Sequence, residues 1–270
     1  MPELPEVETT CRGIAPRVVG RTVSQVIVRC ERLRWPIPTN LADCLSGKTL
    51  ETLDRRGKYL QWHFATGTLL VHLGLSGSLR VYPSPPPLAG RHDHVEWWFG
   101  DDCVRLRDPR RFGAVVWVPK GEVSPLLQRL GVEPLSDDFT GAYLFKYGQK
   151  RRQAIKTVLM NAAVVVGVGN IYANESLFVA GIHPQRPANQ LSIAECTQLV
   201  GVIRQVLQAA IEAGGSSLRD YVGGDGAAGY FQQQHFVYGR DGKACRQCGH
   251  GIEKITLGQR GTFFCPHCQA

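Results

Sequence analysis

Four cysteines near the C-terminus have the types and spacing of a metal site. Cys245-x2-Cys248 is followed, after 16 residues, by Cys265-x2-Cys268. Two close thiolate pairs at that separation can meet around one tetrahedral Zn²⁺. Four thiolates fill the coordination shell and leave no position for water, so the pattern predicts a structural zinc ion rather than a catalytic one. The alternative is a pair of redox Cys-x-x-Cys motifs or free thiols.

The N-terminus carries a second possible chemical group. If Met1 is removed, Pro2 becomes a secondary α-amine, and an α-amine has a pKa of about 7.7–8, against about 10.4 for lysine. Such an amine is substantially neutral at physiological pH and can attack a carbonyl-like carbon, with Glu3 beside it to move protons. The structural alternative is an acidic helix start with a proline in its first turn.

Two further turns are candidates for contacts with nucleic acid. Residues 108–113 read Asp-Pro-Arg-Arg-Phe-Gly between two predicted strands. An exposed Arg and Phe there can wedge between bases, although Phe112 packed in the core is the simpler interpretation. Residues 167–170 lack the third glycine of a dinucleotide fingerprint, because position 172 is Tyr172. They predict instead a tight turn and a helix N-terminus at Asn170, whose N–H groups suit a phosphate.

The elements that must position these groups change in kind along the chain. The first ~120 residues read mostly as short strands rich in Val, Leu, Trp and Phe, with no long helix between them, which predicts an antiparallel sandwich or barrel. In one of them Leu60, Trp62 and Phe64 alternate with polar or aromatic neighbours, so one face is predicted to be buried. Residues 5–12 read as helical. The predicted strands are 58–64, 68–73, 78–82, 94–99, 103–107 and 114–118.

After Lys120 the pattern becomes helical. Ser124 and Pro125 predict the start of a short helix that Gly131 ends, and residues 143–161 carry a helical pattern with a basic face. The clearest helix spans 192–213. It has a capping box of Ser192 and Glu195, a Gly214-Gly215 end, and an apolar stripe of Ile193, Cys196, Leu199, Val200, Ile203, Val206, Leu207, Ala210 and Ile211. We therefore expect an α+β chain with a domain boundary near residues 120–140, and a glycine-rich loop over 223–229.

The charge balance favours a polyanionic partner. Lys and Arg number 31 against 23 Asp and Glu, a net charge of +8, and residues 240–270 hold five basic and two acidic residues. No apolar run approaches the ~18–20 residues of a membrane span, and no signal-peptide segment follows Met1. Nine cysteines, an odd number, argue against a secreted disulfide framework. The expectation is a cytoplasmic protein that binds nucleic acid; a soluble protein that is merely basic is the alternative.

Seven motifs together resemble one known family. They are residues 2–6, 56–59, 72–74, 92–94, 108–113 and 166–172, followed by the four-cysteine finger. In this order, and over essentially the whole chain, they resemble bacterial formamidopyrimidine-DNA glycosylase, also called 8-oxoguanine DNA glycosylase. The resemblance implies a catalytic β-sandwich over 1–130, a helix-two-turn-helix DNA-binding domain over 131–235 and a zinc finger over 236–270.

The resemblance also implies an activity and the residues that carry it. The implied enzyme excises oxidised purines, 8-oxoguanine and formamidopyrimidines, from double-stranded DNA and then cleaves the abasic strand by β,δ-elimination. Pro2 attacks the sugar C1′ to form a Schiff base, and Glu3 is the acid that assists ring opening. Lys58 matches the lysine of β-elimination and phosphate contact. Arg260 matches the arginine of δ-elimination and phosphate binding.

Further DNA contacts are implied in the same way. A flipped base leaves a gap in the stack, and Leu75 with Arg110 and Phe112 would fill it, while residues 216–235 match the loop that covers the extruded purine. A single structural zinc ion, a monomeric state and a bacterial cytoplasm with the enzyme on the nucleoid complete the expectation. The other residues that fall at DNA-contacting positions of the family are His92, Arg151, Lys156 and Asn170.

The chain departs from the family pattern at two places, and two alternative functions remain. Leu75 stands where a methionine is common, and Asn161 where an aspartate is. Endonuclease VIII, a relative of the same fold, prefers oxidised pyrimidines; Leu4 rather than glycine and the intact 108–112 loop favour the purine enzyme. A non-enzymatic protein that only recognises damage is the other alternative. The Pro2-Glu3 terminus argues against it, because binding alone has no use for a secondary amine.

Overall fold

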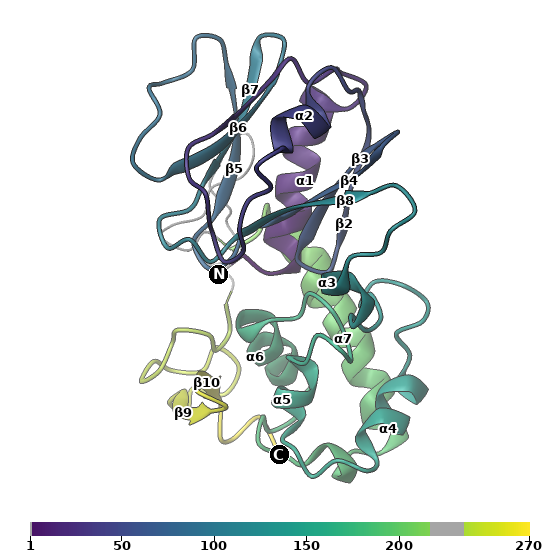
Figure 1. Cartoon of the computed structure of the whole chain (residues 1–270). Helices are drawn as coiled ribbons and strands as arrows, with labels where there is room; N and C mark the ends of the chain where they lie inside the picture. The colour runs from purple at the N-terminus through teal and green to yellow at the C-terminus, as the bar shows by residue number, and fades with distance from the viewer. Residues whose placement is uncertain (1, 217–234) are drawn as a thin grey trace. The chain divides into compact units, whose positions relative to one another are not determined.

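The computed structural model describes residues 2–216 and 235–270 (Figure 1). They divide into two compact units: the first contains the described residues up to Gln128 together with 213–216, and the second contains Arg129–Glu212 together with 235–270. None of the helices in these described ranges has the length and apolarity needed to cross a membrane. The loop predicted over 223–229, and most of the predicted covering loop over 216–235, lie outside the described residues.

The first unit is a sandwich of two antiparallel four-stranded sheets. One sheet has the strand order β1-β6-β7-β5 and the other β2-β3-β4-β8. The predicted antiparallel sandwich is therefore confirmed, and the six predicted strands agree with the observed ones to within about one residue. The strands are β1 Gln25–Val28, β2 Leu50–Arg56, β3 Tyr59–Phe64, β4 Gly67–His72, β5 Ser78–Pro83, β6 Asp93–Phe99, β7 Asp102–Arg107 and β8 Ala114–Pro119.

Large aromatic side chains from both sheets fill the core of this unit. Leu60, Trp62 and Phe64 of β3 are buried, as their alternation predicts. Trp62 meets Trp97 of β6 with their ring centroids 5.2 Å apart and the rings tilted by 45°. Because these two strands belong to different sheets, the contact joins the two layers. Tilted aromatic pairs of this kind are favourable beyond the area they bury.

Helix α1, Leu4–Val18, touches strands of both sheets (Figure 1). The predicted helix over 5–12 was too short: the helix continues past Gly13 and Pro16 because Ile14 and Val18 are fully buried in the shared core. Arg17 in its last turn donates to Asp102 at the start of β7, and this bond lowers the pKa of the Asp102 carboxyl. The C-terminal end of α1 is thus tied to the sandwich. Helices α2 Leu41–Leu45 and α3 Pro125–Gln128 complete the unit.

The second unit is helical, and two of its helices pack on the longest one. Helices α4 and α6 both contact α7, and α6 also contacts strand β10 of the zinc finger. Asn170 begins α6 as predicted, with Gly169 as its N-cap. The elements are α4 Gly141–Gly148, α5 Ile155–Leu159, α6 Asn170–Val179, the 3₁₀ helix η1 Ala188–Gln190, α7 Ile193–Glu212, and the antiparallel strands β9 Glu253–Leu257 and β10 Arg260–Phe264.

The single helix predicted over 143–161 is wrong. The chain forms α4 and α5 with an extended stretch between them, because backbone groups there bond to a distant segment instead of to the preceding turn. The N–H of Asn189 donates to the carbonyl of Arg151, and the N–H of Ile155 donates to that of Arg186. These tertiary hydrogen bonds satisfy the backbone groups that a continuous helix would have paired internally.

The end predicted for the short helix at Gly131 is also wrong, since α3 ends at Gln128. Gly131 lies in the second unit, where a Cβ would come within 2.3 Å of the Val164 carbonyl oxygen. Its N–H donates to the carbonyl of Ala162. The glycine therefore permits a close backbone approach rather than ending a helix.

Helix α7 matches its prediction closely. The Ser192 N–H donates to the Glu195 carboxylate, and the Glu195 N–H donates to the Ser192 hydroxyl, which forms the predicted capping box. Gly214 and Gly215 end it with positive φ. Two residues of the predicted stripe differ, however: Ile193 is exposed and Val206 is only half-buried. Val202, which was not in the predicted stripe, is buried.

Truncation of the inter-sheet tryptophan should test this core. Trp62→Ala removes a fully buried ring from the contact between the sheets, and we expect it to lower the free energy of unfolding of the first unit by about 3–5 kcal/mol. Trp35→Ala, at a side chain that is 44% exposed, is the matched control and should change it far less. Chemical denaturation followed by circular dichroism measures both; equal losses would contradict the assigned core.

Candidate active site and zinc finger

The predicted catalytic pair lies at the positive end of α1. Pro2 and Glu3 are buried, and Glu3 is the N-cap of the helix. The Glu6 carboxylate accepts the backbone N–H of Glu3 at 2.8 Å. Because Pro2 and Glu3 are consecutive, this bond fixes the backbone that carries both groups. The positive end of the helix dipole also favours negative charge there.

Glu6 makes a second backbone contact that sequence reasoning missed. Its Oε1 accepts the N–H of Ser216 at 2.8 Å, across 210 residues of chain. The preceding Gly215 has φ +83°, and a Cβ there would lie 3.2 Å from Glu6 Oε1. One buried carboxylate therefore holds both the terminus that carries the predicted catalytic pair and Ser216. The signal was available in part, because an acidic residue three positions after an N-cap is typical of a capping box.

Lys58 lies in the tight turn between β2 and β3, after Gly57 with φ +59°. Arg55 ties this turn to α1: its Nε donates to Glu8 at 2.8 Å and its Nη1 to the Gly57 carbonyl at 3.1 Å. The half-buried Lys58 is thus positioned relative to the helix that carries Pro2.

His72 lies within electrostatic range of Lys58. Burial, and then the positive charges of Lys58 and Arg34, lower the pKa of His72 to about 4. The ring is therefore neutral at physiological pH, and its Nδ1 accepts the N–H of Gly74 at 3.0 Å. A neutral imidazole at this position adds no charge beside the Lys58 ammonium and helps shape the turn that leads to Leu75.

A buried aspartate shapes the loop over 108–113. Asp108 is fully buried; one carboxylate oxygen accepts the Gly113 N–H at 2.7 Å and the other the Ser76 hydroxyl at 3.1 Å. Its N–H donates to the carbonyl of His92, so that half-exposed histidine lies next to the loop. These bonds hold the ends of the loop, and the intervening Arg111 adopts φ +55°.

The tip of this loop faces solvent. Phe112 is 43% exposed, so the alternative that packs it in the core is wrong. The Arg110 guanidinium carbon lies 5.0 Å from the centroid of its ring. Gly74 packs against the backbone of Phe112, and a Cβ at Gly74 would lie only 2.4 Å from the Phe112 carbonyl carbon. The next residue, the half-buried Leu75, therefore lies close to Phe112. The three residues expected to fill the gap in the DNA stack therefore lie together.

Two of the residues expected to contact phosphate bind one carbonyl group in the second unit, next to the third. The carbonyl oxygen of Gly261 accepts Lys156 Nζ at 3.1 Å and Asn170 Nδ2 at 3.0 Å, and Arg260 is the preceding residue. Lys156 is only 1% exposed and also donates to the Thr262 hydroxyl at 2.6 Å. Its ammonium therefore stabilises the β9–β10 hairpin through these two hydrogen bonds. Arg260, by contrast, is exposed, at the end of a turn in which Gly258 and Gln259 both have positive φ.

Two residues of α6 that sequence reasoning missed accept backbone N–H groups of the finger segment. Asn174 accepts the backbone N–H of Phe263 at 2.9 Å. The Glu175 carboxylate accepts three consecutive N–H groups, those of Phe236, Val237 and Tyr238, at 2.7–3.0 Å. Burial raises the pKa of Glu175, while the three N–H bonds act in the opposite direction.

Arg151 and Asn161 lie beside the same tyrosine. The Arg151 guanidinium carbon is 3.5 Å from the centroid of the Tyr147 ring, and its Nη1 donates to the Tyr147 carbonyl. Asn161 Oδ1 accepts the N–H of Ala163 at 3.0 Å. Its Nδ2 also donates to the Tyr147 hydroxyl at 3.5 Å. An aspartate would accept the Ala163 bond but has no N–H to donate, so the departure to asparagine keeps the turn, removes a negative charge and adds a donor toward Tyr147.

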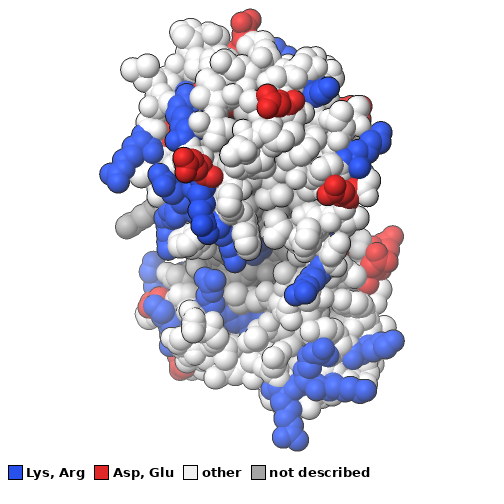
Figure 2. Space-filling model, viewed as in Figure 1, with Lys and Arg blue, Asp and Glu red and all other residues white. Residues whose placement is uncertain are grey.

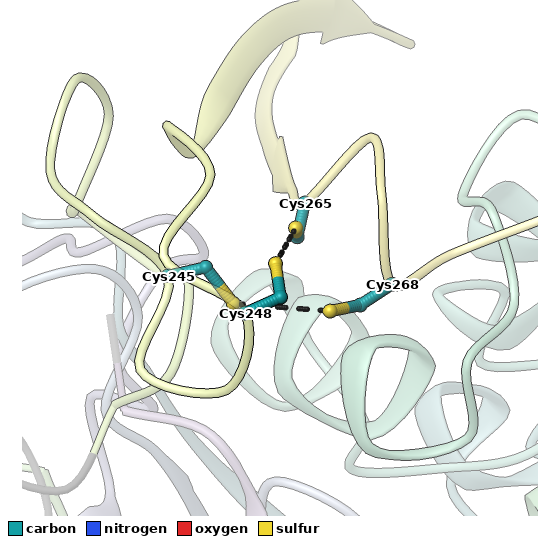
Figure 3. Close-up of side chains that lie close together, drawn as sticks. All are labelled: Cys245, Cys248, Cys265 and Cys268. Atoms are coloured by element: carbon teal, nitrogen blue, oxygen red, sulfur yellow. Dashed lines mark hydrogen bonds between the residues drawn. The ribbon is translucent and has the colours of Figure 1, made fainter.

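The four cysteines converge as their spacing predicts (Figure 3). All four Sγ atoms lie within 4.8 Å of one another, with Cys248–Cys265 at 3.4 Å and Cys245–Cys268 at 4.0 Å. Four thiolates at 2.3 Å from a tetrahedral Zn²⁺ are about 3.8 Å apart, so the donor set fits that ion. A disulfide would require about 2.05 Å. Cys245 and Cys265 also pack in a small core with Phe178 of α6.

Lys and Arg side chains are more widespread than Asp and Glu on the face seen in Figure 2, in both units. This distribution accords with the net charge of +8 and suits a polyanionic partner. Within the first unit the structure brings Pro2, Glu3 and Lys58 into one framework. Within the second it brings Arg260, Lys156 and Asn170 together. The zinc cysteines support the base of the hairpin that carries Arg260.

Comparisons with known proteins cover the whole chain. Residues 1–115 match the formamidopyrimidine-DNA glycosylase N-terminal domain, 130–222 the H2TH domain of the same enzymes, and 242–270 the zinc finger found in FPG and IleRS. The formamidopyrimidine-DNA glycosylase of Aromatoleum aromaticum is 57% identical over 270 residues, covering 100% of this chain and 99% of that protein. That of Neisseria meningitidis is 55% identical over 274 residues and the full length of both.

Solved structures of Fpg proteins are similar to this chain over nearly its full length. The Lactococcus lactis Fpg in complex with DNA containing an abasic site has a TM-score of 0.91 at 36% identity, over 99% of both chains. The Thermus thermophilus FPG protein has a TM-score of 0.88 at 40% identity, over 99% of this chain and 98% of that one. The α+β fold, the four-thiolate zinc centre and the similarity over the full length lead to one conclusion. The chain belongs to the formamidopyrimidine-DNA glycosylase family.

Proposed function

We propose that this protein excises oxidised purines from double-stranded DNA and cleaves the resulting abasic strand, with Pro2 as the nucleophile. Its family makes it a base-excision-repair DNA glycosylase that binds DNA and a structural zinc ion. The observation that carries the proposal is the placement of Pro2 and Glu3, buried at the N-terminus of α1 and held there by Glu6. Solved L. lactis relatives bound to DNA with an abasic site and to Fapy-dG DNA support the substrate class.

The chemistry follows from a secondary amine. Once Met1 is removed, the Pro2 nitrogen forms a bond to C1′ while the bond from C1′ to the base breaks, and the base leaves with the electron pair and gains a proton. Glu3 delivers a proton to the sugar ring oxygen, which opens the ring and gives an iminium ion at C1′. Loss of a C2′ proton then expels the 3′-phosphate, and a second elimination expels the 5′-phosphate.

Lys58 and Arg260 are the residues that we assign to these eliminations. The support for Lys58 is its position in a turn that Arg55 ties to α1. The support for Arg260 is an exposed guanidinium on a hairpin fastened by Lys156, Asn170 and zinc. Guanidinium groups bind phosphate oxygens bidentately, which suits a group that must hold a leaving phosphate. When bound, the zinc ion supplies only rigidity, since four thiolates complete its shell.

Residues outside the chemistry prepare the substrate. Base extrusion costs a few kcal/mol. The exposed Arg110 and Phe112, with the half-buried Leu75 beside them, can occupy the vacated space. We infer further DNA contacts for His92, Arg151 and Asn170. The preference for purines over pyrimidines rests on the intact loop over 108–112 and on Leu4. A monomer in the bacterial cytoplasm, on the nucleoid through DNA, remains our expectation, and size-exclusion chromatography tests the oligomeric state.

Trapping with borohydride tests the nucleophile. Borohydride reduces an iminium ion to a stable amine, so reaction with 8-oxoguanine DNA should leave the protein joined to DNA at Pro2, as peptide mass spectrometry can establish. Glu3→Gln should lower base excision by at least about 100-fold, because an amide cannot deliver the proton. The exposed Glu51→Gln is the matched control and should behave as the unaltered protein.

Protein that retains Met1 provides a second comparison. Its Pro2 nitrogen is part of a tertiary amide, whose delocalised lone pair cannot attack. Such protein should bind damaged DNA but neither cut it nor form the covalent species. A covalent bond through Lys58 instead, or undiminished cutting with Met1 in place, would overturn the assignment.

Truncation of the loop tip should separate recognition from bond breaking. Phe112→Ala should reduce excision of 8-oxoguanine from a duplex by roughly tenfold or more, because the extruded state loses the ring that fills the gap. Cleavage at a preformed abasic site, which needs less help to leave the stack, should change little. Leu88→Ala, at a side chain 98% exposed in another loop, is the control. Equal losses on both substrates would point to a packing role for Phe112.

Lys156 should act by fastening the hairpin. Lys156→Met keeps the length of the side chain but removes the donor to Gly261 and Thr262, and we expect the free energy of local opening of β9–β10 to fall by about 1–3 kcal/mol. Amide hydrogen exchange measures this opening, and DNA affinity should fall with it while zinc content stays constant. The exposed Lys146→Met is the control. Unchanged protection of the hairpin amides would show that the bonds do not fasten it.

A further inference from the structure

A second set of metal-binding groups adjoins the four-cysteine centre. Cys248 Sγ, one ring nitrogen of His250 and one of His267 all lie within 4.8 Å of one another. Cys248 is half-buried and belongs to both sets, whereas both histidines are exposed. The zinc-finger role uses neither histidine.

We propose that Cys248, His250 and His267 form a second, solvent-facing metal site, in which the Cys248 thiolate bridges the structural zinc ion and a further divalent ion. The ion would be of the zinc class, such as Zn²⁺, Co²⁺ or Cd²⁺, because mixed imidazole and thiolate donors suit borderline and soft metals. Three protein donors would leave an open position for water, unlike the closed centre beside them.

The distances are close to those that such an ion requires. Cys248 Sγ and His250 Nδ1 are 3.9 Å apart. Donors on one tetrahedral ion, at about 2.0–2.1 Å for nitrogen and 2.3 Å for sulfur, are separated by roughly 3.3–3.8 Å. The His250 and His267 rings are stacked, with centroids 4.5 Å apart and planes inclined by 6°. One ring must turn for both lone pairs to meet at the ion, and exposed side chains have that freedom.

The backbone places one histidine from each half of the finger on the same side of the centre. His250 follows the first cysteine pair, and its carbonyl accepts the N–H of Cys245 at 2.7 Å. His267 lies inside the second pair, where the N–H of Gln269 donates to the Cys265 carbonyl. The two rings therefore meet because the fold brings the two cysteine pairs together.

Electrostatics also favours a second cation at this place. Four thiolates around one Zn²⁺ carry a formal net charge of minus two, and Cys248 is half-buried rather than fully enclosed. Arg246, in the same knuckle, opposes the binding of a further cation. The competing interpretation is that His250 simply donates an N–H to the Cys248 sulfur, in which case no second ion would bind.

Cobalt binding to the zinc-loaded full-length protein tests the site. The protein is first adjusted to one zinc per chain by metal analysis and then titrated with Co²⁺. We expect one cobalt ion to bind without release of zinc and to give the near-ultraviolet absorption of a thiolate-to-cobalt transition. His250→Ala and His267→Ala should each weaken cobalt binding by at least about tenfold while zinc content is retained, since loss of a direct ligand should exceed the effect of an outer one. His63→Ala, in the first unit, is the matched control.

Several results would overturn the proposal. Absence of cobalt binding would favour the simple N–H bond from His250. Release of zinc in step with the absorption would mean exchange at the four-cysteine centre. Cobalt binding without the thiolate absorption would exclude the bridging role of Cys248. Binding that survives both histidine substitutions would place the ion elsewhere.

Discussion

The carboxylate of Glu6 is the constraint on which the proposed chemistry most depends. It accepts the N–H of Glu3 at one oxygen and that of Ser216 at the other, and the side chain is 1% exposed. Buried carboxylates are costly unless they are well satisfied by hydrogen bonds. The same principle recurs at Glu175, which accepts three successive N–H groups at the start of the finger segment. In both places a buried acid fixes backbone that is remote in sequence.

The sandwich was predictable wherever strands have a clear inside and outside. Leu60, Trp62 and Phe64 alternate and are all buried, which is the pattern that a strand with one covered face imposes. Strand β1 was missed because it has four residues, and β2 because most of its side chains are polar and at least partly exposed. The error over 143–161 had another cause: helix propensity yielded there to tertiary backbone bonds, which a local pattern cannot reveal.

The candidate site divides in a similar way. The zinc cysteines follow from spacing alone. The chemistry of an α-amine makes Pro2 a possible nucleophile, but the pattern also fits a helix start, and the roles of Pro2 and Glu3 follow from the family resemblance. Asn174 and Glu175 could not be found in this way, since they act on backbone N–H groups, which carry no sequence signature. For Glu6, the capping-box spacing indicates the contact with Glu3 but not the contact with Ser216. Lys156 illustrates the reverse. The family resemblance implied a phosphate contact for it, but its burial and its bond to the Gly261 carbonyl give it an internal role.

The closed shell of the zinc centre has a consequence for how the enzyme depends on its surroundings. Because the metal touches no reacting atom, it can be exchanged for another ion that binds four thiolates in a tetrahedron. Which ion occupies the site then depends on which ions are available in the cell. Among the described residues, Pro2 and Glu3 lie in no group of three or more side chains that could hold a metal ion. Scarcity of zinc would thus leave chains that keep the proposed Pro2 nucleophile but have lost the rigid hairpin that presents Arg260. The metal supply of the cell would then set the fraction of molecules able to grip DNA, independently of how many carry a competent nucleophile.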